Sequence, residues 1–130
     1  MRIVLAALIF SFAGFVGSAS GADPQPVSMV SLVADPQRFD GQFIRVIAYL
    51  RVEFEGTVLF IHREDYEQAI IPNGIWIALS DTQMKIAKKL SNSYVIAEGI
   101  FSSKDKGHMD MWSGSLGQVT RLDKWKSHRK

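Results

Sequence analysis

The chain contains no cysteine, and this absence excludes several kinds of structure and chemistry. No disulfide, thiolate metal site or cysteine nucleophile can form. The fold must therefore be stabilised by its apolar core alone. With 130 residues, of which 47% are hydrophobic, the chain is expected to form one domain around one small core.

The sequence also lacks an apolar run long enough to cross a bilayer as a helix. The run from Ile3 to Val16 is shorter than the roughly 20 residues that such a helix needs. It follows a basic start and precedes the small residues 17–22, which is the layout of a secretory signal peptide. We therefore predict a signal peptide over residues 1–22, cleaved after Ala22 or, as an alternative, after Ala19. The mature protein is then exported to the periplasm or secreted, without a membrane span; an uncleaved anchor is the other reading.

Net charge is low, at +2, and once the predicted signal peptide is removed the net positive charge lies at the C-terminal end, in Arg121, Lys124, Lys126, Arg129 and Lys130. Residues 23–120 hold more acidic than basic side chains, so the basic character belongs to the start and the tail of the chain. This distribution is poor evidence for a nucleic-acid surface. We expect residues 126–130 to form an unstructured basic tail. Contact of this tail with anionic lipid, nucleic acid or an acidic partner is the alternative, and Trp125 could tether it to the domain.

The stretch from Gly41 to His62 organises the rest of the chain. Every second residue from Ile44 to Phe54 is apolar and the intervening positions include charged residues, so a long strand with one buried face is predicted. Glu55 and Gly56 interrupt the pattern, which resumes from Thr57 to His62. The pattern is typical of a β-hairpin.

The turn of this hairpin decides which side chains face the core. A two-residue turn would require positive φ at Glu55, so we predict a three-residue turn with Gly56 in the left-handed region. Glu53 then pairs with Thr57, and the inner face of the second strand carries the side chains of Val58, Phe60 and His62. The alternative register places Leu59 and Ile61 there instead, because a slip of one residue reverses the faces.

The remaining elements follow from periodicity, caps and turn residues. They are a helix over 28–34 capped by Ser28 and ended by Pro36, a loop over 63–73 that could hold one helical turn, a strand over 74–79, a helix over 82–90 capped by Ser80 or Asp81, a strand over 94–101 with a bulge or corner at Gly99, a loop over 102–115 and a strand over 116–122. Residues 23–27 are a lead-in, and the domain covers 28–125.

The order of these elements, β-β-β-α-β-β, resembles the OB-fold, a five-stranded Greek-key barrel. The motif P-x-x-F-D-G-Q-x-I-R-V-x-A-Y-L over 36–50 and the motif V-I-A-E-G-I over 95–100 are similar to small exported bacterial OB-fold proteins of uncharacterised function. The resemblance covers roughly residues 28–123. It implies a mainly β fold and export, and no particular activity. One departure is the short first loop at Glu55 and Gly56, which weakens the likeness to OB-folds that bind nucleic acid.

Two polar clusters are candidate sites. Asp105, His108 and Asp110 lie close together in the 102–115 loop and form a weak candidate metal site, with a solvated loop as the alternative. His62 lies next to two carboxylates at the end of a strand, where acid-base chemistry or a simple capping role are both open. No nucleophile motif accompanies them, so no catalytic residue is assigned.

From these residues we expect a binding module without catalytic activity and without a cofactor. The candidate ligand-binding residues are His62, Tyr66, Trp76, His108 and Trp112. The expected ligand is a protein, peptide, glycan or small molecule, and the protein is expected to be a monomer. Nucleic-acid binding and a metal-dependent hydrolase using His62 and His108 are the alternatives.

Overall fold

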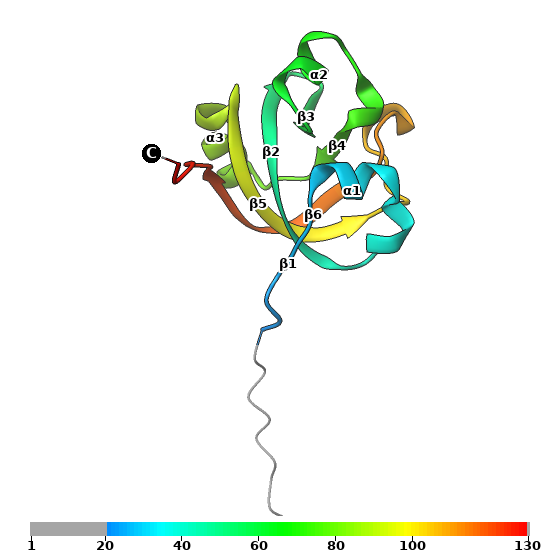
Figure 1. Cartoon of the computed structure of the whole chain (residues 1–130). Coiled ribbons are helices and arrows are strands. Elements are labelled where there is room, and N and C mark those ends of the chain that lie inside the picture. The colour runs from blue at the N-terminus through cyan, green and yellow to red at the C-terminus, as the bar shows by residue number, and fades with distance from the viewer. Residues whose placement is uncertain (1–20, 130) are drawn as a thin grey trace, which may run out of the picture.

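The computed structural model describes residues 21–129; the first 20 residues of the predicted signal peptide lie outside this range. In the described residues the fold is mainly β, with six strands in one mixed sheet and few helices (Figure 1). The elements are β1 Gln25–Pro26, α1 Met29–Ala34, η1 Pro36–Phe39, β2 Phe43–Glu53, β3 Gly56–Phe60, α2 Arg63–Glu67, η2 Ile71–Asn73, β4 Gly74–Ile77, α3 Asp81–Leu90, β5 Ser93–Ser102, η3 His108–Asp110 and β6 Ser115–Lys124.

The sheet has the strand order β1-β2-β3-β4-β6-β5, and β5 also pairs with β2. The pairings from β2 through β3, β4, β6 and β5 therefore lead back to β2. The β1–β2 and β4–β6 pairs are parallel and the others antiparallel. β2 and β5 are long, curved and side by side in Figure 1. Five strands were predicted; the sixth, β1, lies in the segment predicted as a lead-in, where backbone pairing with β2 outweighs the presence of Pro26.

The inner face of β2 is the one that the alternating pattern predicts. Ile44, Val46, Ala48 and Leu50 are at most 1% exposed and belong to the main core. The pattern fails at Phe54, whose side chain is fully exposed because the residue lies in the turn after β2.

The predicted register of the β2–β3 hairpin is wrong. Glu53 pairs with Gly56 rather than with Thr57, so the turn consists of Phe54 and Glu55. Gly56 is not at positive φ. Leu59 is therefore completely buried in the main core, while Val58 and Phe60 lie on the opposite face of the sheet.

The helix boundaries follow their predicted caps. Ser28 accepts a hydrogen bond from the Ser31 amide at the start of α1, and Ser80 accepts one from the Gln83 amide at the start of α3. The predicted bulge in β5 is confirmed, because the pairing with β6 shifts between Glu98 and Ile100. A Cβ atom on the intervening Gly99 would lie 2.5 Å from the carbonyl oxygen of Gly117, so the two strands come too close for a side chain there.

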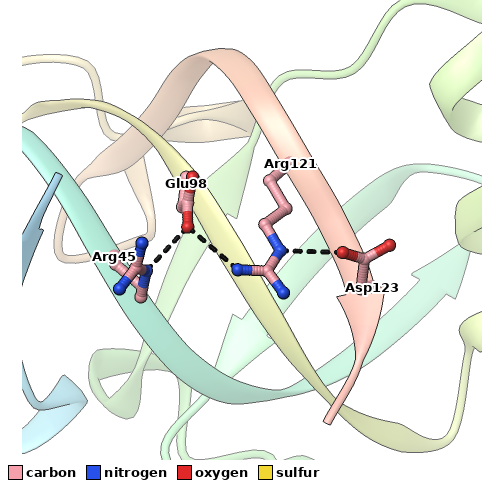
Figure 2. Close-up of polar contacts among 4 residues, drawn as sticks. All are labelled: Arg45, Glu98, Arg121 and Asp123. Carbon is pink, nitrogen blue, oxygen red and sulfur yellow. Dashed lines mark hydrogen bonds and ion pairs between the residues drawn. The ribbon is translucent and has the colours of Figure 1, made fainter. Parts of the chain in front are cut away.

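A row of charged side chains crosses the outer face of β2, β5 and β6 (Figure 2). Glu98 on the central strand accepts hydrogen bonds from Arg45 Nε at 2.6 Å and from Arg121 Nη1 at 3.3 Å. Asp123 accepts a further bond from Arg121 Nε at 2.7 Å. These bonds, first to Asp123 and then to Glu98, raise the pKa of the Arg121 guanidinium. The Glu98 side chain is only 11% exposed, so its charge is balanced mainly by the two arginines.

We expect Glu98→Gln to lower the free energy of unfolding by about 1–2 kcal/mol, because the amide removes the negative charge that strengthens the hydrogen bonds from Arg45 and Arg121. Urea denaturation measures the change. Asp123→Asn is the matched control: its carboxylate is 61% exposed, and exposed ion pairs contribute about 0–1 kcal/mol. Equal losses in the two variants would contradict a special role for the central carboxylate.

Candidate ligand-binding groove

A groove lies on the outer face of β3 and β4, on the side opposite the main core. Its volume is about 290 Å³, close to the lower end of small-ligand sites. The residues that line it are Arg51, Glu53, Glu55, Gly56, Val58, Phe60, Tyr66, Ala69, Ile71, Trp76, His108, Met111 and Trp112. Figure 1 shows the segments that border it, which are the β2–β3 turn, α2 with the segment leading into β4, and the orange loop before β6.

The floor of the groove is a second, smaller apolar cluster. Tyr49, Val58 and Phe60 are buried there, and Tyr66, Trp76 and Trp112 pack against them. The Phe60 ring contacts Trp112 edge to face, with centroids 5.8 Å apart, and lies 5.9 Å from the Tyr66 ring. The aromatic walls are thus fixed by packing before any ligand arrives.

Tyr66 is held in place by α2 and its cap. The amide of His62 donates to Asp65 Oδ2 at 2.8 Å, and Asn73 Nδ2 donates to Asp65 Oδ1 at 2.8 Å. Through these two bonds the buried carboxylate of Asp65 joins the start of α2 to the segment before β4. The single turn of α2 therefore presents Tyr66 to the groove in a defined orientation.

Trp76 is enclosed by two glycines from different parts of the chain. A Cβ atom on Gly56 would lie 2.6 Å from Trp76 Cζ3, and a Cβ atom on Gly107 would lie 2.7 Å from Trp76 Cβ, Cγ and Cδ2. Neither position can carry a side chain while the indole stays where it is. The β2–β3 turn and the loop before β6 are thus both shaped around this one aromatic ring.

Arg51, Glu53 and Tyr66 form the polar end of the groove. The Tyr66 hydroxyl donates to Glu53 Oε1 at 2.7 Å, and Arg51 Nε donates to the same oxygen at 3.2 Å. The Arg51 guanidinium lies over the Tyr66 ring, 4.6 Å from its centroid, and also donates to Asn92 Oδ1. The bond from Tyr66, followed by those from Arg51, lowers the pKa of Glu53; the same bond raises the pKa of Tyr66.

We expect Tyr66→Phe to raise the pKa of Glu53 toward its ordinary value of about 4.3, because the principal donor is lost. A depressed carboxyl pKa stabilises the fold above the pKa of the unfolded chain, and this contribution is lost as the pH falls through the folded-state value. The variant should therefore lose less stability than the wild type as the pH falls from the ordinary carboxyl value through the lowered pKa of the folded state. A carboxyl NMR titration measures the shift, and an unchanged Glu53 titration would contradict it.

Four of the five predicted ligand-binding residues line this groove: Tyr66, Trp76, His108 and Trp112. His62 does not. Its exposed side chain borders a different hollow, between α1 and the outer side of β2, together with Val27, Val30 and Ile47. The two histidines proposed for a hydrolase are therefore not brought to one site.

Asp105, His108 and Asp110 do not form a ligand set. Asp105 Oδ1 accepts a hydrogen bond from the Gly107 amide at 3.0 Å, which closes the turn before η3. Within residues 21–129, no three histidine or acidic side chains are grouped as a metal ion requires. His108 instead faces the groove from its rim.

Sequence reasoning missed Arg51, Glu53, Val58 and Phe60 as groove residues. Arg51 and Glu53 occupy the odd positions of β2, which the alternating pattern assigns to the outer face. A correct register would have added Val58 and Phe60 beside them, so the missing signal was the length of the turn.

The sequence matches no protein-family model and no curated protein. Among solved structures, the fold is similar to a DUF3299 family protein from Pseudomonas aeruginosa PAO1, with a TM-score of 0.51 and 7% identity. That similarity covers 83% of this chain and all of the other, and it concerns the fold alone. A protein from Leishmania major Friedlin, provisionally identified as an aspartyl-tRNA synthetase, has a TM-score of 0.46 and 10% identity over 96% of this chain and 24% of its own. This second similarity carries no conclusion.

Over the described residues, no helix combines the length and the apolar character needed to cross a bilayer.

Proposed function

We propose that this protein is a binding module without catalytic activity, and that its ligand occupies the groove beside Trp76. The single observation that carries the proposal is a preformed aromatic groove that is not part of the main core. Concave, mostly apolar pockets with a few polar groups are the usual sites of ligand binding. The polar groups of this one, Arg51, Glu53 and Tyr66, bond mainly to one another, which suits recognition better than acid-base chemistry.

We also propose that the sheet is an OB-fold barrel preceded by β1. The support is the cycle of pairings β2-β3-β4-β6-β5-β2, with α3 between β4 and β5 along the chain. OB-folds bind ligands on the face of their second and third strands, between the first and last loops. Here those strands are β3 and β4, and those loops are the Phe54–Glu55 turn and residues 103–114. The groove therefore lies where this fold would hold a ligand.

Nucleic acid is the weaker candidate. Glu53 and Glu55 border the groove and repel phosphates, while the Arg51 guanidinium is engaged by Glu53, Tyr66 and Asn92. Export remains part of the proposal and is carried by residues 1–22 alone; N-terminal sequencing of the protein from a cell-envelope fraction tests it, with Asp23 or Ser20 as the expected first residue.

The binding site is tested by ¹⁵N-¹H correlation spectra of the protein titrated with a panel of peptides, neutral oligosaccharides, nucleotides and single-stranded DNA. We expect at least one ligand class to shift the indole N–H signals of Trp76 and Trp112, while that of Trp125, which lies outside the groove, stays unchanged. Repeating each titration at two salt concentrations identifies phosphate contacts by their steep salt dependence. No saturable shift with any class, or shifts only outside the groove, would overturn the proposal.

A further inference from the structure

A second hollow adjoins the groove on the other side of Trp76. Its volume is about 360 Å³, and it shares Glu53, Glu55, Gly56 and Trp76 with the first. Its other lining residues are Phe54, Thr57, Ile77, Ala78, Leu79 and Met84. The two hollows meet at the indole of Trp76. A ligand that fills both must therefore be elongated and pass over this ring.

The side chains around the two hollows are typical of a protein-binding surface. Phe54, at the tip of the hairpin, is fully exposed and lines the second hollow, and Met111, which is 44% exposed, lines the first. Aromatic residues and methionine are enriched in protein interfaces, and methionine adapts to varied apolar partners. The second hollow offers only Thr57, Glu53 and Glu55 as polar side chains. A glycan would leave most of its hydroxyl groups without partners there, whereas apolar side chains would be well accommodated.

The charges on this surface indicate the sign of the charge that the ligand carries. Arg51 is neutralised by Glu53, which accepts its Nε donor. Glu55 lies at the junction of the two hollows, and its exposed side chain makes no hydrogen bond or ion pair with another residue of the 21–129 range. The junction therefore carries one uncompensated negative charge, which attracts a cationic side chain and repels an acidic one.

We propose that the two hollows bind an extended polypeptide segment of a partner protein. The segment carries an apolar side chain in each hollow and a lysine or arginine between them, beside Glu55. Alternate side chains of an extended segment point to the same face, so two anchors can enter the hollows while the backbone crosses Trp76. This inference rests on the proposed function and adds the class of ligand.

The experiment selects binders from a random peptide display library on the purified protein and measures the affinity of the synthesised peptides by fluorescence anisotropy. We expect the selected peptides to share two apolar residues flanking a basic one. Three variants test each part of the site: Ala69→Glu places a carboxylate in the first hollow, Ala78→Glu places one in the second, and Glu55→Lys reverses the charge at the junction. Ala69 and Ala78 are exposed, so these substitutions leave the core unchanged.

Each of the three variants should weaken peptide binding by at least about tenfold, which corresponds to about 1.4 kcal/mol. Ala34→Glu, at an exposed position of α1 that lines neither hollow, is the matched control and should bind as the wild type does. The peptide proposal would be overturned if only one of Ala69→Glu and Ala78→Glu weakened binding, if the selected peptides shared an acidic motif, or if all variants bound equally well. If the spectra show an oligosaccharide or nucleotide in the groove and no peptide is selected, the peptide class is wrong and the binding site stands. If no ligand of any class binds, both proposals fail.

Discussion

Leu59→Ala is expected to lower the free energy of unfolding by about 3 kcal/mol, because the side chain is completely buried and its loss leaves a cavity. Leu59 pairs with Leu50 across the β2–β3 hairpin, and both side chains face the main core. In the register predicted from the sequence, Leu59 would face away from that core and the substitution would cost little. Urea denaturation of the purified protein measures the difference.

Val30→Ala is the control for this prediction. Val30 is 59% exposed on α1, so removal of its methyl groups should change the free energy of unfolding by no more than about 0.5 kcal/mol. A loss at Leu59 that matched the loss at Val30 would mean that the hairpin pairs in the other register in solution.

The predicted register is wrong because Gly56 was assigned to the turn of the hairpin. Local rules favour glycine where φ is positive, and Gly56 was assigned to the turn on that ground. In the structure Gly56 is the first residue of β3, and its missing side chain makes room for Trp76. The reason for this glycine is a contact with a residue 20 positions away, which no local turn rule can detect.

Much of the fold could nevertheless be predicted from the sequence. The caps at Ser28 and Ser80, the inner face of β2 from Ile44 to Leu50 and the bulge at Gly99 all depend on local or periodic signals, and each is confirmed. β1 escaped prediction because two residues, one of them a proline, carry no periodic signal. Its pairing depends on the neighbouring strand.

The candidate site, too, could be predicted from the sequence only in part. Tyr66, Trp76, His108 and Trp112 could be selected as aromatic or polar residues near predicted strand ends and loops, and they do converge on one groove. His62 could not be separated from them, because β3 ends at Phe60 and His62 is the N-cap of α2, where the alternation of the strand no longer applies. The charge at the groove depends on which carboxylates remain unpaired, as with Glu55, and this requires side-chain contacts.

Gly107→Ala is expected to lower the free energy of unfolding by about 2–4 kcal/mol and to displace Trp76. Gly107 has φ 66° and ψ −156°, a backbone conformation that is nearly restricted to glycine and costs other residues about 1–3 kcal/mol. The added methyl carbon would also lie 2.7 Å from Trp76 Cβ, which is anchored to β4 and cannot rotate away. Crowding of this kind costs about 1–3 kcal/mol. Urea denaturation and near-ultraviolet circular dichroism measure the two effects.

Gly41→Ala separates the strain from the crowding. Gly41 also has positive φ, at 75°, but a Cβ atom there would have no neighbour within 4 Å. We expect this variant to lose about 1 kcal/mol from backbone strain and to keep the wild-type aromatic spectrum. If Gly107→Ala left that spectrum unchanged as well, Trp76 would not depend on the loop before β6. Because the same indole borders both hollows, a changed spectrum should be accompanied by weaker binding of any ligand that crosses it, even though Gly107 contributes no side chain to the contact.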